Sequence, residues 1–424
     1  MSILRDLPRF RYLWLSKAIS STGNSVGRIA LVLLVAPSGP AAVTWALLAT
    51  MTGVLVSPLA GAVADRVDQR RLLRGAEIGQ GICYAVMAAV RLPLPLLLFL
   101  VALAAVLASF ASPAGKSSVR RLVPAERWPQ ANAMLSVAMT LQVVAGPAIG
   151  GMLAGVAGAP TAFAVNAASF AVSALLLTGL GPLPPDTLPL DTPPPDVLPP
   201  PDAQRGGAGP APLRPPRLLA DIAAGLRYAG RTPVVRSMAL GTLVFVAFAS
   251  MDNVVVVFLV KADLHGSGAE YGVLAATFGA GMVAASLALT RWAAGRPAAF
   301  WLIGGVITGA AGTVATGLAP TAVLAGAAQA VAGAGNTADL VGTDTLIQQQ
   351  VPSGMLGRTF ALVYGAAQLA SVISYALAGP LVSLAGARAA LVIAGAGALA
   401  GLAVLVPGLR GSPSSAPVGP VAPG

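Results

Sequence analysis

Charged residues are scarce in this chain of 424 residues, and their scarcity excludes most soluble proteins. Only 10% of the residues are Asp, Glu, Lys or Arg, whereas an ordinary soluble protein carries about 25%. Hydrophobic residues make up 56% of the chain, enough for roughly twelve membrane spans at about 20 apolar residues each. The composition therefore predicts an all-α membrane protein. The 49 Gly and 35 Pro agree with this, because membrane helices tolerate both residues well.

Cysteine and histidine are nearly absent. Cys83 is the single cysteine and His265 the single histidine, so an internal disulfide, a Cys-based metal cluster and His-rich metal chemistry are excluded. The sequence also contains no Ser/His/Asp, metal or nucleotide-phosphate constellation, which argues against an enzyme. We expect no metal and no cofactor.

Long apolar segments define the organisation of the chain. A hydropathy window of about 19 residues predicts spans at 13–36, 42–64, 72–91, 94–114, 131–157, 160–180, 235–260, 270–290, 298–318, 321–344, 358–384 and 388–407. These spans predict an N-terminal bundle at 1–182, a Pro-rich linker at 183–216, a C-terminal bundle with a leading amphipathic helix at 217–407 and a disordered tail at 408–424.

Basic residues predict how the spans are oriented. Nearly all Lys and Arg fall in segments that share a side with the N-terminus. By the positive-inside rule, both termini are expected to be cytoplasmic, in a multi-pass protein of the inner or plasma membrane. The net charge of +11 is spread over many short segments instead of one patch, so the expected partner is the lipid bilayer and not a nucleic acid.

An internal repeat relates the two sets of spans. The Val-Pro pair at 123–124 recurs at 351–352, and Asn24 corresponds to Asn253 at nearly the same separation. Two halves in the same orientation imply a pseudo-two-fold axis along the membrane normal and a central cavity between them. We expect the protein to function as a monomer.

The segment from Gly61 to Arg71 reads GAVADRVDQRR. It resembles the G-x-x-x-D-R-x-x-x-R-R loop of the major facilitator superfamily, and the resemblance implies twelve transmembrane helices in two pseudo-symmetric six-helix bundles. It also implies a conformational latch made of Gly61, Asp65, Arg66, Arg70 and Arg71. In this latch the Asp65 carboxylate lies against the N-terminal end of the eleventh span, where it gains from free amides. An ordinary basic loop is the alternative.

The fifth predicted span contains GPAIGG at 146–151. This segment resembles the antiporter-type GPxxGG motif of proton-driven exporters. We assign Gly146, Pro147, Gly150 and Gly151 to close helix packing, with a kink at the proline. Packing alone and an antiporter signature both remain open.

Longer segments resemble the drug and macrolide efflux branch of the superfamily, the group that includes the enterobactin exporter. They are FRYLW at 10–14, RLVPAE at 121–126, ANAMLS at 131–136, NAASFAVSALLL at 166–177, GLRYAGRTP at 225–233 and QQQVPSGMLGRTFAL at 348–362. The resemblance implies efflux of a small molecule. Related efflux proteins often carry an acid just after the glycine of the first span, where this chain has Asn24.

Polar side chains in the middle of spans are candidates for substrate binding and proton coupling. They are Asn24, Arg28, Gln142, Asp252, Asn253, Asn336, Asp339 and Gln368. A charge at the centre of the bilayer costs about 2.5 to 3.5 kcal/mol, so the charged members should face a cavity and be compensated.

The repeat places Arg28 and Asp252 on corresponding spans, which predicts an ion pair across the cavity. A carboxyl group beside an arginine can load and release a proton as the cavity changes sides, and a static pair that fixes helix register is the alternative. Asn336 and Asp339 should share a helix face. Glu77 is expected near a cytoplasmic span end, at the membrane interface.

The sequence as a whole predicts a secondary active transporter. We expect a proton-coupled exporter that moves hydrophobic or amphiphilic small molecules by alternating access and uses the proton gradient as its energy source. Two alternatives stay open: a facilitator or symporter that imports a small nutrient, since fold does not settle direction, and a non-transporting membrane receptor or scaffold.

Overall fold

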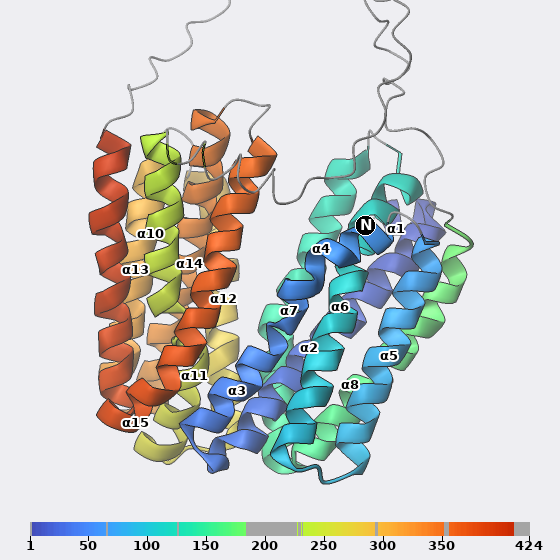
Figure 1. Ribbon diagram of the computed structural model, residues 1–424, viewed down its shortest axis with the longest axis horizontal. Coiled ribbons are helices and arrows are strands. Elements are labelled where there is room, and N and C mark those ends of the chain that lie inside the picture. Colours follow the sequence, from blue (N-terminus) through green and yellow to red (C-terminus); the bar gives the residue numbers. More distant parts are fainter. Residues whose placement is uncertain are drawn as a thin grey trace, which may run out of the picture.

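The computed structural model describes residues 2–64, 67–124, 127–183, 227, 230, 232–292, 296–351 and 356–410, and over these ranges it contains helices and no strand. Figure 1 shows two helical bundles side by side, one from the first half of the chain and one from the second. The N-terminal bundle contains α1 (Ser2–Asp6), α2 (Pro8–Val35), η1 (Ala36–Ser38), α3 (Pro40–Thr50), α4 (Thr52–Ala64), α5 (Gln69–Ala89), α6 (Leu94–Leu122), α7 (Trp128–Val156), α8 (Ala159–Leu176) and η3 (Leu177–Leu180).

The C-terminal bundle has fewer, longer elements. They are α10 (Pro233–Ala249), α11 (Asp252–Phe258), the π-helical turn η5 (Leu259–Asp263), α12 (Gly268–Trp292), α13 (Ala298–Leu318), α14 (Ala322–Gln350) and α15 (Leu356–Arg410). The last of these is two helical segments that meet at Gly386, whose φ of 80° lies in the left-handed region that glycine adopts without strain.

The membrane character predicted from composition is confirmed. Within the described ranges, nine helical segments are long and apolar enough to cross a membrane. Large apolar side chains also project outward, as expected where the solvent is lipid; examples are Leu55, Val156, Val323 and Leu384, each more than four-fifths exposed. The count of twelve spans stays a prediction.

Several helices run past the predicted span ends. The helix α6 continues to Leu122 and α14 continues to Gln350, because the ends of membrane helices extend beyond the apolar window into polar sequence. The helix α15 reaches Arg410, past the predicted end of the C-terminal bundle at 407. The predicted linker lies outside the described residues apart from Leu183, and the amphipathic helix at 217–231 lies outside them apart from Arg227 and Gly230.

Two spans are interrupted in their middle. Between α10 and α11 the amide of Met251 bonds to the carbonyl of Phe248 at 3.1 Å, and between α3 and α4 the amide of Met51 bonds to the carbonyl of Leu48 at 2.9 Å. Such tight turns inside a helix often mark a hinge. The first break places Asp252 at the start of α11.

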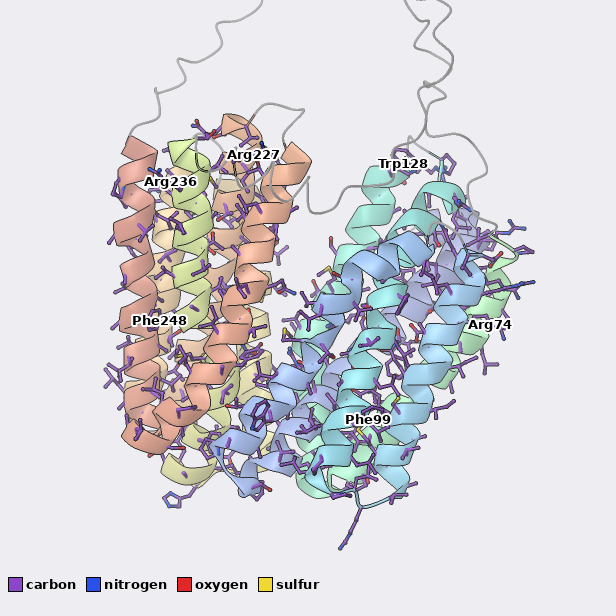
Figure 2. All side chains as sticks on the ribbon, in the orientation of Figure 1. Arg74, Phe99, Trp128, Arg227, Arg236 and Phe248 are labelled. Carbon is purple, nitrogen blue, oxygen red and sulfur yellow. The ribbon has the colours of Figure 1, made fainter. Side chains whose placement is uncertain are left out.

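The bundles meet at one end and diverge at the other. The helix α7 packs against α12 across the interface, and α3 packs against α15 and α11. Figure 1 shows these contacts at the end opposite the N-terminus, while the bundles separate toward the end that carries it. Figure 2 labels Trp128, Arg227 and Arg236 at this separated end.

Candidate functional site

A cavity of about 360 Å³ lies between the two bundles. Its wall is formed by α2, α3 and α7 on one side and by helices from α10 to α15 on the other. Much of this wall is apolar, and its large side chains include Ile29, Leu47, Phe245, Phe278 and Met282. A concave, mostly apolar surface with a few placed polar groups is typical of a small-molecule binding site.

Asp252 lies on the cavity wall and is held by a neighbouring helix. The Nε2 amide of Gln329 on α14 donates a hydrogen bond of 2.8 Å to Oδ1 of Asp252. The predicted ion pair with Arg28 is absent from this structure, in which both residues are described. Tyr271 on α12 lies within electrostatic range of both charges, so a phenol stands near the position where a direct pair was expected.

Arg28 lies where the central cavity meets a second one. This side cavity, of about 220 Å³, extends into the N-terminal bundle and shares Ser25, Arg28 and Gln142 with the central cavity. Among the residues that the structure describes, the Arg28 guanidinium has no hydrogen bond and no ion pair. It lies within electrostatic range of Tyr84 and Tyr375.

The other predicted polar residues fall into two groups. Those on a cavity wall are Asn24, Gln142, Asn253 and Asn336. Asn24 accepts a hydrogen bond of 3.1 Å from the Tyr84 hydroxyl, and Asn253 donates one of 3.3 Å to the carbonyl of Ser250.

Asp339 and Gln368 lie outside both cavity walls. Asp339 is buried, and Thr343 lies one turn further along α14. Its backbone lies directly against Gly305 of α13. Asp339 therefore faces a helix contact, whereas Asn336, three residues earlier, faces the cavity.

The predicted latch is described in part. Asp65 and Arg66 lie outside the described residues, and Gly61 lies in α4. The guanidinium of Arg70 donates to the carbonyls of Leu177 and Thr178, at 3.3 and 2.7 Å, within the same bundle.

Asp68 was not singled out from the sequence, although an Asp just before a helix is a typical N-cap. Its Oδ1 accepts from the backbone amide of Arg71 at 2.9 Å, and its Oδ2 accepts from the amide of Leu183 at 2.9 Å. Asp68 therefore ties the start of α5 to the end of the last span of its own bundle.

The GPAIGG segment of α7 contacts two helices. A Cβ at Gly150 would lie 2.9 Å from Cα of Val26 on α2. A Cβ at Gly272 of α12 would lie 2.6 Å from Cα of Gly151, so the two backbones touch across the bundle interface. The neighbouring pair Gly155 and Gly268 is similarly close, and we call these four glycines at 151, 155, 268 and 272 the glycine seam.

Glu77 corrects an expectation. It was expected at the membrane interface, but only 6% of its surface is exposed, and its Oε1 accepts a hydrogen bond of 3.2 Å from Ser20. The reason is that its face of α5 packs against α8 of the same bundle, with a hydrogen-bonded pair formed by Ser16 and Ser173 close by. Hydropathy alone could not reveal which way this face points.

Two helical bundles that flank a central cavity are the architecture of secondary membrane transporters. The chain belongs to the Major Facilitator Superfamily, which matches residues 13–252. Residues 204–410 match a second family, described as Transmembrane secretion effector. The protein is therefore a membrane transporter of this type and not an enzyme.

Relatives and solved structures agree with this assignment. An uncharacterized MFS-type transporter, YfiS of Bacillus subtilis (strain 168), is 24% identical over 90% of this chain and 88% of its own length. An auto-inhibited POT family peptide transporter has a TM-score of 0.72 at 13% identity, covering 98% of this chain and 99% of its own. A bacterial homologue of the human lysosomal transporter Spinster, inward-facing and unoccupied, has a TM-score of 0.66 at 17% identity, covering 95% and 96%. These structural likenesses show the fold.

Proposed function

We propose that this protein exports hydrophobic or amphiphilic small molecules by alternating access, and that inward proton flow drives the export. The apolar wall of the central cavity suits such substrates better than sugars or phosphates. The efflux-type motifs and the match to a family described as a secretion effector support the outward direction. The protein acts as a monomer, with a small-molecule substrate and with the proton gradient in place of a cofactor.

The distribution of basic residues supports a cytoplasmic position for the separated end of the bundles and for both termini. On this assignment the structure is the inward-facing state, because the bundles touch at the opposite end. Binding from the cytoplasm is then followed by closure of the separated end and opening of the glycine seam.

The position of Asp252 carries the coupling proposal. Its carboxylate stands on the cavity wall, and within the described part of the chain it accepts one side-chain hydrogen bond, from Gln329. Protonation converts an acceptor oxygen into a donor, which changes the bond between α11 and α14. Because Asp252 follows a helix break, this change is coupled to a point at which the span can bend.

The test is transport by protein reconstituted in lipid vesicles with and without a pH gradient, with a fluorescent amphiphilic dye as substrate. The wild type should move the dye against its concentration gradient only while the pH gradient exists. Asp252→Asn should lose this concentrative transport but keep dye-for-dye exchange. The matched control is Asp263→Asn, which removes an acid of the same span that lies 3.9 Å from Arg388 and outside the cavity wall.

Dye transport that persists after the pH gradient is collapsed would contradict coupling. Uptake from the extracellular side would favour the importer. A panel of compounds with no flux for any member would favour a receptor or scaffold.

A further inference from the structure

The side cavity of the N-terminal bundle has a composition unlike that of the central cavity. Asn24, Thr50, Gln80 and Tyr84 contribute polar groups to its wall, which is built from α2, α3, α5, α6 and α7. Among the described residues that line it, none is Asp or Glu, and Arg28 at its mouth is the only charged one. The side cavity is therefore a polar, positively charged compartment.

Arg28 is the charged group of this compartment that is open to a partner, because it is exposed at the junction of the two cavities. A guanidinium inside the membrane region is unfavourable unless it is compensated, and Arg28 has neither a hydrogen bond nor an ion pair in the part of the chain that the structure describes. Asp252, the acid on the wall of the central cavity, is bonded to Gln329 instead. The fixed cation is thus left available at the junction of the two cavities.

The neighbouring polar groups are arranged to add donors. The Tyr84 hydroxyl donates a hydrogen bond to the side-chain oxygen of Asn24. The Asn24 amide nitrogen remains available to donate to a ligand. The planar fork of an arginine matches a carboxylate particularly well, because two parallel N–H groups can bind both oxygens. The combination favours a small anionic group over a cationic one.

We propose that the side cavity binds the carboxylate headgroup of an amphiphilic substrate through Arg28, while the apolar body of that substrate lies in the central cavity. Phe245, Phe278 and Met282 line the central cavity on the side of the C-terminal bundle and supply apolar contacts for the body. Asp252 on the same side repels the headgroup, so the charges of the two bundles orient the molecule. This inference rests on the proposed transport of amphiphiles and specifies the substrate class.

The experiment measures equilibrium binding to the purified full-length protein, which needs no transport. The probes are three fluorescent amphiphiles that share one aromatic body and carry a carboxylate, a primary amide or a primary amine. Fluorescence polarisation should show the carboxylate probe binding at least about tenfold more tightly than the amide probe, since a charge-assisted pair replaces a neutral hydrogen bond. The amine probe should bind most weakly.

Arg28→Gln should bring the carboxylate and amide probes to the same affinity without lowering affinity for the amide probe. Arg236→Gln, which removes an exposed arginine outside both cavity walls, should leave the preference intact. Asn24→Ala should weaken the preference in part, and it keeps the test decisive if Arg28→Gln fails to fold.

Equal binding of the carboxylate and amide probes by the wild type would overturn the proposal, as would an equal loss of all three probes in Arg28→Gln. The two proposals fail separately. Proton-driven flux without a carboxylate preference in binding would support the proposed export and contradict the proposed headgroup site. A clear binding preference for the carboxylate probe without flux of any probe would support the headgroup site and contradict the proposed export.

Discussion

The two bundles have related helix orders but different interiors. Buried polar side chains gather inside the N-terminal bundle; they include Ser16, Ser20, Glu77, Asn166 and Ser173. In the C-terminal bundle α13 and α14 also bury polar side chains, such as Thr316 and Asp339, but the backbones of these two helices meet through glycines. A Cβ at Gly312 or Gly335 would collide with the backbone of the opposite helix. Both halves use both kinds of contact, but buried hydrogen bonds such as those of Ser16 and Glu77 mark the first half, and backbone contact between α13 and α14 marks the second.

This difference predicts which substitutions each bundle tolerates. Helices in a bilayer associate through packing of small residues and through hydrogen bonds, and a typical bond contributes about 0.6 kcal/mol, with a maximum near 1.7. We therefore expect added volume to harm the C-terminal bundle most and lost polar groups to harm the N-terminal bundle most. Four substitutions test this comparison.

The largest effect is expected for Gly335→Val in α14. A Cβ at this position would lie 2.6 Å from Cα of Gly309, so the helices α13 and α14 must separate. We expect a loss of about 3 kcal/mol or more in stability, measured as a fall in the thermal midpoint by fluorescence-detected size exclusion. The control is Gly304→Val in α13, where a Cβ would meet nothing within 4 Å. If both variants behave alike, close backbone approach does not distinguish this half.

The second largest effect is expected at the glycine seam, where a helix of one bundle contacts a helix of the other. Gly272→Val should leave each bundle folded but push apart the backbones at Gly151 and Gly272, shifting the two conformations by about tenfold. The readout is thiol labelling of Ala275→Cys, a cavity position, with a reagent that does not cross the membrane. Labelling from the extracellular side should rise, and the native Cys83 is buried and should add little background. Unchanged labelling would mean that the seam does not close the cavity.

A smaller effect is expected for Glu77→Leu in the N-terminal bundle. The change leaves Ser20 without its acceptor in a buried position, which should cost about 1 kcal/mol. Glu77→Gln keeps an acceptor oxygen and should cost less. The thermal midpoints of the two variants give the measurement, and a leucine variant more stable than the wild type would show that this polar interior serves something other than stability.

The smallest effect is expected for Thr44→Val at the second contact between the halves. The Thr44 hydroxyl donates a hydrogen bond of 3.1 Å to the carbonyl of Tyr375, and valine preserves the shape while removing the bond. We expect a change of about 0.6 kcal/mol, or roughly a twofold to threefold shift in the labelling ratio of the same cysteine reporter. If Thr44→Val shifts the labelling ratio as much as Gly272→Val does, the hydrogen bond of Thr44 and the glycine seam contribute equally to closing the cavity, contrary to this expectation.

Much of the fold can be predicted from the hydropathy pattern of the sequence. Apolar segments of span length coincide with helices, because a bilayer forces every backbone group in a span to be satisfied within a helix. Charged and amide residues placed in mid-span also indicated where the cavity lies, and Arg28, Gln142, Asp252 and Asn336 are on its walls. A polar residue in a span has few favourable positions other than a cavity or a helix contact.

The remaining features depend on the rotation of each helix, which hydropathy does not encode. Gln329 lines the cavity and was missed, although its place as an amide in mid-span is the signal that identified Gln142. Tyr271 also lines the cavity, and its position near the start of a span gave no such signal. Asp339 and Gln368 look equivalent to the cavity residues by depth, yet one faces α13 and the other lies outside the cavity walls. Packing between helices that are distant in the sequence decides the hydrogen-bond partner of an ionic group; Gln329 on α14 is the partner of Asp252 on α11.

The glycine seam has a mechanical consequence because it lies near one end of long helices. The helix α7 has 29 residues, or about 43 Å of length, and the seam occupies its last turns. A rotation of about 10° around such a pivot moves the distant end by about 7 Å. As long as the seam stays closed, it acts as the pivot of both bundles, and a displacement too small to break many contacts there changes the width of the other end by several ångströms.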